Sequence, residues 1–280
     1  MFTGKLLKTY IFLLLAVICL MAVLIYFKSV ATPVRDYREI RREGILRIVT
    51  EYGQAGYYVS DDSQIEGFQY ALCREIARQA DMEVLMYLEM SLEKSFSGLS
   101  AGQYDIIARN IPVTSKLKEK YLFLEPVVLD RQALVQRTAA ANRGAEPIRN
   151  QLHLAHRTLH VPEASPAILR LDNLRSEIGD TIFIVEDPLY SSEQLCIMVA
   201  RGDIDFAVCD RQIAQLSKKQ FPELDIETDI SFTQLQSWVV RKDAPVLADS
   251  LNRWLQKIRD SGAYDRIREQ YYSDLKPANQ

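Results

Sequence analysis

The segment GQYDIIARN, residues 102–110, decides the fold class of this 280-residue chain. A glycine after a helical stripe, an aspartate three residues later and a short apolar run predict a buried strand that ends at the polar Asn110. The segment GDIDFAVCD, residues 202–210, has the same order and ends at Asp210. This internal similarity predicts two units of similar structure.

The sequence before this segment alternates between strand and helix patterns. The strand-like runs ILRIVT and EVLMYL stand at residues 45–50 and 83–88, and apolar residues recur at helical spacing after Glu66 and again after Leu92. The order β, α, β, α, β predicts a parallel sheet covered by helices, which is an α/β domain.

A second α/β unit is predicted over residues 138–233. Small and polar residues interrupt the pattern at 138–150, and the strand-like runs RTLHV, TIFIV and IDFAVC then alternate with helices that start near Ser165 and Ser191. Ser191 with Gln194 forms a capping-box pattern. The strand-like LQSWVV and two amphipathic helices complete the chain.

Asn110 and Asp210 stand where an open parallel sheet binds ligands, beyond the carboxyl ends of its strands. The alternative is that any strand end becomes polar as it meets water. Because two units end alike, we interpret these two positions as parts of one binding site.

The composition, 48% hydrophobic and 25% charged, is that of a globular protein. A net charge of −3 creates no field that favours nucleic acid, so that class of partner is excluded. Cys73, Cys196 and Cys209 are expected to be small buried thiols, and a disulfide between Cys196 and Cys209 is the alternative.

Residues 10–27 carry no charge and follow Lys5 and Lys8. This length predicts a retained transmembrane anchor, because the apolar stretch of a cleavable signal is usually shorter. Positive charge after the span argues against export of the following domain. Acidic residues accompany that charge, and a long domain can be translocated against it, so we expect the domain outside the cytoplasm.

Four stretches together resemble the family-3 periplasmic solute-binding proteins, which have a two-lobed, type 2 periplasmic-binding fold. They are LRIVT, IEGFQYALCREIARQADMEV, LSAGQYDIIARNIPVTSKLKEKYLFLEPVV and RGDIDFAVCD, within residues 45–275. The combination is also similar to the sensor half of membrane-bound lytic transglycosylase F, whose catalytic muramidase-like domain would need more chain. We therefore expect a binding protein and no enzyme.

The resemblance implies ligand-binding roles for five residues. Asp210 would receive the ammonium group of a ligand, and the helix start at Ser165 would attract a carboxylate. Tyr52 and Tyr57 would form an aromatic wall, and Thr114 would close the turn on the hinge side.

The sequence also departs from the family pattern. Receptors for free amino acids usually carry an arginine three residues after this threonine, which clamps the α-carboxylate, but Leu117 stands there. Pro112 replaces a hydroxyl residue, and Asn110 replaces a glycine. Arg109 is a candidate for the missing charge; the alternative is a solvent-facing arginine at a strand end.

Two other groups of residues suggest chemistry and are set aside. His153, His156 and His160 lie close in sequence, but only two would share a strand face, and no cysteine or carboxylate completes a metal set. Glu186 and Asp187 fit a strand-end turn better than a general acid and base. We expect no metal and no cofactor.

The expected organisation is a membrane anchor at 1–28, a tether at 29–44, lobe 1 at 45–137 plus 234–280, and lobe 2 at 138–233. The expected function is closure on a small polar ligand, amino-acid-like or peptidoglycan-derived, for transport or sensing at the periplasmic side of the inner membrane. An ABC permease and a cell-wall enzyme are the expected partners. The alternative function is non-catalytic regulation of a cell-wall lytic transglycosylase.

Overall fold

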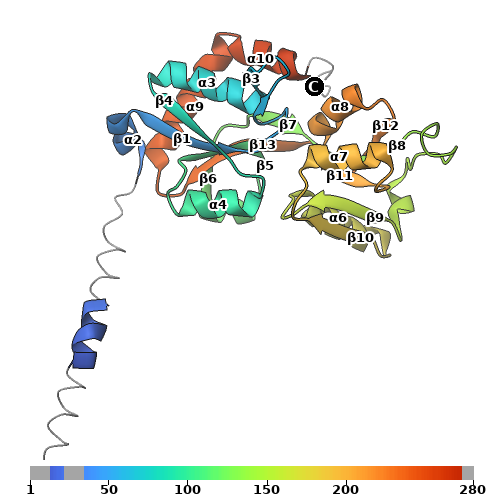
Figure 1. Ribbon diagram of the computed structural model, residues 1–280, viewed down its shortest axis with the longest axis horizontal. Coiled ribbons are helices and arrows are strands. Elements are labelled where there is room, and N and C mark those ends of the chain that lie inside the picture. The colour runs from blue at the N-terminus through green and yellow to red at the C-terminus, as the bar shows by residue number, and fades with distance from the viewer. Residues whose placement is uncertain (1–12, 22–34, 273–280) are drawn as a thin grey trace, which may run out of the picture. The chain divides into compact units, whose positions relative to one another are not determined.

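The computed structural model describes residues 13–21 and 35–272, and the chain divides into two units, Met1–Arg35 and Asp36–Gln280 (Figure 1). In the first unit, residues 13–21 are helical. The remainder of the expected anchor lies outside the described residues. No helix in the described part of the chain is both long enough and apolar enough to cross a bilayer.

The second unit contains two large sheets, and each is the centre of one lobe (Figure 1). The strands of the lobe 1 sheet are β1 (Ile45–Thr50), β4 (Glu83–Leu88), β5 (Ile106–Pro112), β6 (Tyr121–Phe123), β7 (Val128–Asp130) and β13 (Gln234–Arg241). Their order is β4-β1-β5-β13-β6, with β7 also paired to β13. β1 is parallel to β4 and β5, whereas β13 is antiparallel to β5.

Helices cover both faces of this sheet. They are α2 (Tyr37–Glu43), α3 (Phe68–Ala80), α4 (Leu92–Ser100), α5 (Ser115–Lys120), α9 (Pro245–Asp260) and α10 (Ala263–Tyr272), and a small hairpin joins β2 (Tyr58–Val59) to β3 (Ile65–Glu66). Successive strand residues point to opposite faces. Ile48 and Trp238 therefore pack in the cluster that includes α3 and α9, while Val49 and Val239 pack with Leu99 of α4.

The lobe 2 sheet has mixed strand directions. Its strands are β8 (Gln132–Arg137), β9 (Thr158–Pro162), β10 (Phe183–Asp187), β11 (Ala207–Asp210) and β12 (Leu224–Asp229), and its helices are η1 (Gln151–Leu154), α6 (Ala167–Ile178), α7 (Ser192–Arg201) and α8 (Arg211–Gln220). The order is β10-β9-β11-β8-β12, and β8 is antiparallel to both of its neighbours. The predicted capping box of Ser191 and Gln194 is present at the start of α7.

β8 corrects the predicted boundary between the lobes. The prediction assigned residues 132–137 to lobe 1, but β8 pairs with β11 and β12 in lobe 2. The polar interruption after residue 137 is thus a loop within lobe 2, and the chain crosses between the lobes before β8. The part of the predicted tether at 37–43 is helix α2, whose Ile40 is fully buried in the lobe 1 core.

Cys73, Cys196 and Cys209 are buried free thiols, as expected. The Sγ atoms of Cys196 and Cys209 lie 3.7 Å apart, so the alternative disulfide is not formed.

Candidate ligand-binding site

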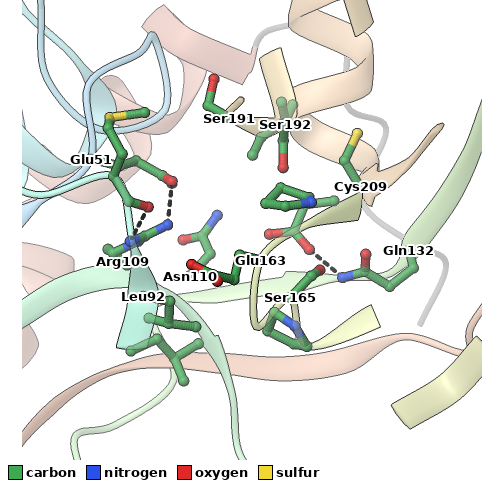
Figure 2. Close-up of a pocket in the computed structure, with 16 residues that line it drawn as sticks. Glu51, Leu92, Arg109, Asn110, Gln132, Glu163, Ser165, Ser191, Ser192 and Cys209 are labelled. Atoms are coloured by element: carbon green, nitrogen blue, oxygen red, sulfur yellow. Dashed lines mark hydrogen bonds and ion pairs between the residues drawn. The ribbon is translucent and has the colours of Figure 1, made fainter. Parts of the chain in front are cut away.

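One cavity of about 60 Å³ receives residues from both lobes (Figure 2). Lobe 1 contributes the ends of β1 and β5, and lobe 2 contributes the β9–α6 turn, the start of α7 and the end of β11. Asn110 and Asp210 both line this cavity.

Asp210 is the last residue of β11 and the N-cap residue of α8, but its side chain does not cap the helix. Asp130, at the end of β7, takes that role and accepts a hydrogen bond from the backbone N–H of Gln212 at 3.1 Å. The Asp210 carboxylate is therefore available to the cavity. Its Oδ1 accepts hydrogen bonds from Gln132 Nε2 and, at 3.1 Å, from Gln236 Nε2.

Burial raises the pKa of Asp210 to about 7, and the negative charge of Glu51 adds to this shift. The hydrogen bonds from the two glutamines and the positive charge of Arg109 oppose it. The pKa of Asp130 is also raised, because the carboxyl group is buried and faces the charge of Asp210. A cation placed beside Asp210 would relieve this unfavourable charge.

A chain of hydrogen bonds fixes the orientation of the Asn110 amide. The indole Nε1 of Trp238, which can only donate, donates to Gln69 Oε1 at 2.6 Å. Gln69 Nε2 must then donate, and it bonds Asn110 Oδ1 at 2.7 Å. Asn110 Nδ2 is left as a buried donor without a hydrogen-bond partner among the described residues.

The alternative interpretation, in which Arg109 faces solvent, is wrong. Its Nη2 donates to Glu51 Oε2 at 2.5 Å, and its Nη1 donates to the carbonyl oxygens of Glu89 and Met90 at 3.4 and 3.2 Å. Only 12% of the arginine side chain and 20% of the glutamate side chain are exposed. The guanidinium at the cavity is therefore already neutralised, and Figure 2 shows this pair at one side of the site.

Ser165 lines the cavity at the β9–α6 turn. Its Oγ accepts a hydrogen bond from Ala167 N–H at 3.3 Å, and its own N–H donates to the carbonyl oxygen of Pro162. The Ala164 N–H donates to Glu186 Oε2 at 3.0 Å. Position 166 is a proline and has no N–H.

The other three predicted residues lie outside the cavity lining. Thr114 caps α5, accepting a hydrogen bond from Leu117 N–H at 3.3 Å, and borders a neighbouring groove of about 1070 Å³ between α4, α5 and α6. Tyr52 is half exposed and forms an isolated bridge with Tyr57. Tyr57 packs edge-on against Tyr70, with ring centroids 5.3 Å apart.

Glu193, in the first turn of α7, lies outside the cavity lining but makes a contact between the lobes that the sequence analysis missed. Its Oε1 accepts hydrogen bonds from the backbone N–H groups of Gln54 at 2.7 Å and Ala55 at 3.4 Å in lobe 1. Burial raises its pKa to about 7, with the charge of Glu51 adding to the effect. The capping box located the helix start, but no local signal revealed the partner loop.

Glu51 and Gln132 were also missed. Glu51 directly follows β1, so the rule about carboxyl strand ends could have found it. Gln132 is the first residue of β8, where that rule does not apply, and β5 itself continues past Asn110 to Pro112. The histidines do not share one site: His156 pairs with Asp180 at 3.2 Å, and His160 pairs with Asp187 at 3.0 Å.

A family model described as bacterial extracellular solute-binding proteins, family 3, matches residues 46–274. The chain is similar to membrane-bound lytic murein transglycosylase F of Desulfosudis oleivorans, with 30% identity over 85% of this chain and 52% of the relative. The protein of the same name from Pseudomonas fluorescens strain Pf-5 is 23% identical over 84% of this chain and 48% of the relative. The chain thus spans about half the length of these curated relatives.

Solved structures share the fold. A mutant of ArgBP from T. maritima superposes with a TM-score of 0.73 at 21% identity, covering 85% of this chain and 99% of that chain. An amino acid ABC transporter substrate-binding protein, AbpA of Streptococcus pneumoniae bound to L-arginine, gives a TM-score of 0.72 at 18% identity, covering 84% and 98%. The two-lobed α/β fold is therefore that of the periplasmic-binding type.

Proposed function

Because the chain belongs to the bacterial extracellular solute-binding proteins of family 3, we propose that it is a receptor that closes on a small ligand bearing an ammonium group, with Asp210 as the ammonium acceptor. The observation that carries this proposal is the partly buried carboxylate of Asp210 in a cavity lined by both lobes. A desolvated carboxylate without a cation is unfavourable, and an ammonium ligand would supply one.

Closure follows from the division of the site. The ligand would contact Asp210 of lobe 2 and Asn110 of lobe 1 at once, so the shut arrangement would gain contacts that an open one lacks. Ser165 and Arg109 complete the proposed site. Thr114, Tyr52 and Tyr57 lie outside the cavity lining and remain proposed ligand contacts. The cavity needs no chemical step for this role, and we propose no catalytic activity.

The proposed location is the periplasmic side of the inner membrane, with residues 10–27 as a single-pass anchor and an ABC permease or a cell-wall enzyme as partner. Support comes from the uncharged run in the sequence and from relatives that are named membrane-bound. Proteolysis of spheroplasts tests it: a protease added outside should remove the domain, and protection of the domain would contradict the orientation.

A second candidate function is regulation of a lytic transglycosylase by a chain that does not itself cleave the cell wall. The names of the relatives favour it. The two functions differ in ligand. Thermal responses to muropeptides alone would favour the regulator, and responses to simple amines would favour the general receptor.

The decisive experiment is a thermal-shift screen of the full chain in detergent against amino acids, amines, small peptides and muropeptides. A ligand at roughly 100 times its Kd should raise the Tm by about 5 °C or more. Asp210→Asn should lower the affinity for a responding amine at least about thirtyfold. Asp203→Asn, an exposed carboxylate near the same strand, is the control and should leave affinity unchanged. Equal affinity in Asp210→Asn and the unaltered protein would refute the assignment.

A further inference from the structure

A receptor for a free amino acid needs a site for the α-carboxylate as well as one for the ammonium group. The resemblance places that site at an arginine after Thr114 and at the backbone N–H groups of the β9–α6 turn.

The arginine is replaced by Leu117, which packs with the apolar cluster under α4 and borders the large neighbouring groove. The nearest substitute, Arg109, is held by the Glu51 carboxylate and by two backbone carbonyl oxygens. A ligand carboxylate bound to this guanidinium would have to share it with Glu51, which places two carboxylates beside one cation in a poorly solvated site.

The N–H groups of the β9–α6 turn are occupied as well. Those of residues 163 and 165 donate to backbone carbonyl oxygens, and that of residue 164 donates to Glu186. Residue 166 is proline, and the N–H groups of residues 167 and 168 both donate to Ser165. No N–H from residue 163 to residue 168 remains to bind an anion.

The remaining groups at the cavity disfavour an anion and provide for a neutral acceptor. Three carboxylates, Glu51, Glu163 and Asp210, line it against the single guanidinium of Arg109. The unpartnered donor Nδ2 of Asn110 is neutral, and a buried donor of this kind requires an acceptor. An amide carbonyl oxygen accepts a hydrogen bond without adding negative charge.

We infer that the site selects ammonium compounds whose neighbouring carboxyl group is masked as an amide and rejects the corresponding free α-amino acids. The inference rests on the proposed function, because it takes Asp210 as the ammonium site. Glu51 and Leu117 are the specificity-determining residues of the proposed site. Glu51 neutralises Arg109, and Leu117 stands where the family usually carries an arginine.

The test compares matched pairs of probes on the full chain in detergent: L-alanine with L-alaninamide, L-lysine with L-lysinamide, and L-arginine with L-argininamide. Cadaverine and agmatine, which have an ammonium or guanidinium group but no carbonyl group, form a third arm. We expect at least one amide to bind at least about tenfold more tightly than its free acid and than the carbonyl-free amines.

Glu51→Gln makes the comparison specific. Removing this charge releases Arg109, so the ratio of amide affinity to acid affinity should fall about tenfold. Glu75→Gln removes the carboxylate of a surface ion pair with Arg78 on α3 and should leave the ratio unchanged. Circular dichroism of each variant confirms that the ratio is measured on folded protein.

Each outcome decides the inference. Free acids that bind as tightly as their amides would overturn it and leave the ammonium receptor standing. Carbonyl-free amines that bind as tightly as the amides would overturn the role of Asn110. No response to any amine, acid or amide would overturn the ammonium receptor itself. A ratio that is the same in Glu51→Gln and Glu75→Gln would remove Glu51 as the determinant.

Discussion

The Glu193 carboxylate of lobe 2 lies directly against Gly53 of lobe 1, so that a Cβ atom on Gly53 would come within 2.7 Å of both carboxylate oxygens. The same carboxylate accepts hydrogen bonds from the two N–H groups that follow Gly53. The contact joins the two lobes, and we expect it to favour the shut arrangement in the proposed closure.

Gly53→Ala should weaken ligand binding about tenfold, which corresponds to roughly 1.4 kcal/mol. The added methyl group would displace the Glu193 carboxylate and weaken this contact between the lobes, on which we expect the shut arrangement to depend. Calorimetric titration of a responding ligand measures the effect. Gly144→Ala is the matched control, because Gly144 also has a positive φ, +85°, but no atom lies near its Cβ position. Equal losses in the two variants would point to backbone strain instead.

Closure without ligand should become less favourable as the pH rises through about 7. Burial in the closed form raises the pKa of Glu193 to about 7, so closure takes up a proton between the ordinary pKa of a glutamate and that value. The closed population is therefore larger at pH 5.5 than at pH 8. Small-angle scattering should give a larger radius of gyration at the higher pH.

Glu193→Gln should reduce this change in radius, since the amide cannot titrate. Glu75→Gln, on the surface of lobe 1, should retain it. A pH dependence that is equal in both variants would assign the effect to other carboxyl groups.

Amine binding should show the opposite pH dependence. The ligand ammonium requires an ionised Asp210, whose pKa in the free site is about 7, so affinity rises with pH up to about 7 and then levels off. Below that value the slope approaches about tenfold per pH unit. Titration calorimetry in two buffers of different ionisation enthalpy should detect proton release on binding.

The Glu193→Gln background separates this effect from closure, because there the main cross-lobe carboxyl no longer titrates. In that background, Asp210→Asn should lower affinity and flatten the profile. A steep profile that survives the substitution would show that another group controls binding.

Gln69→Leu should destabilise the protein by about 2 kcal/mol, because it leaves Trp238 Nε1 and Asn110 Oδ1 without their partners. It also frees the Asn110 amide to rotate, so the preference for amide ligands should decrease. Urea denaturation measures the first effect and calorimetry the second. Gln256→Leu, which removes an exposed hydrogen bond to Asp260 on α9, should change neither. An unaltered ligand preference in Gln69→Leu would show that the amide orientation is irrelevant to recognition.

Several features of the fold followed from the sequence. The runs IIA and AVC are buried strands, β5 and β11, because a strand covered on both faces needs uninterrupted apolar residues. The cap at Ser191 is where its spacing predicted it. Asn110 and Asp210 line one cavity, although β5 continues past the predicted strand end at Asn110 to Pro112.

Only the tertiary structure decided to which lobe β8 belongs, which carboxylate neutralises Arg109, and which backbone N–H groups donate hydrogen bonds to Glu193. Glu193 and Gln54 are 139 residues apart in the chain, and Arg109 and Glu51 are 58 apart. Periodicity and capping are encoded within a few residues, because backbone geometry repeats over that length. The partner of a charged side chain depends instead on strand order and on the approach of the two lobes, and no local pattern in the sequence specifies either.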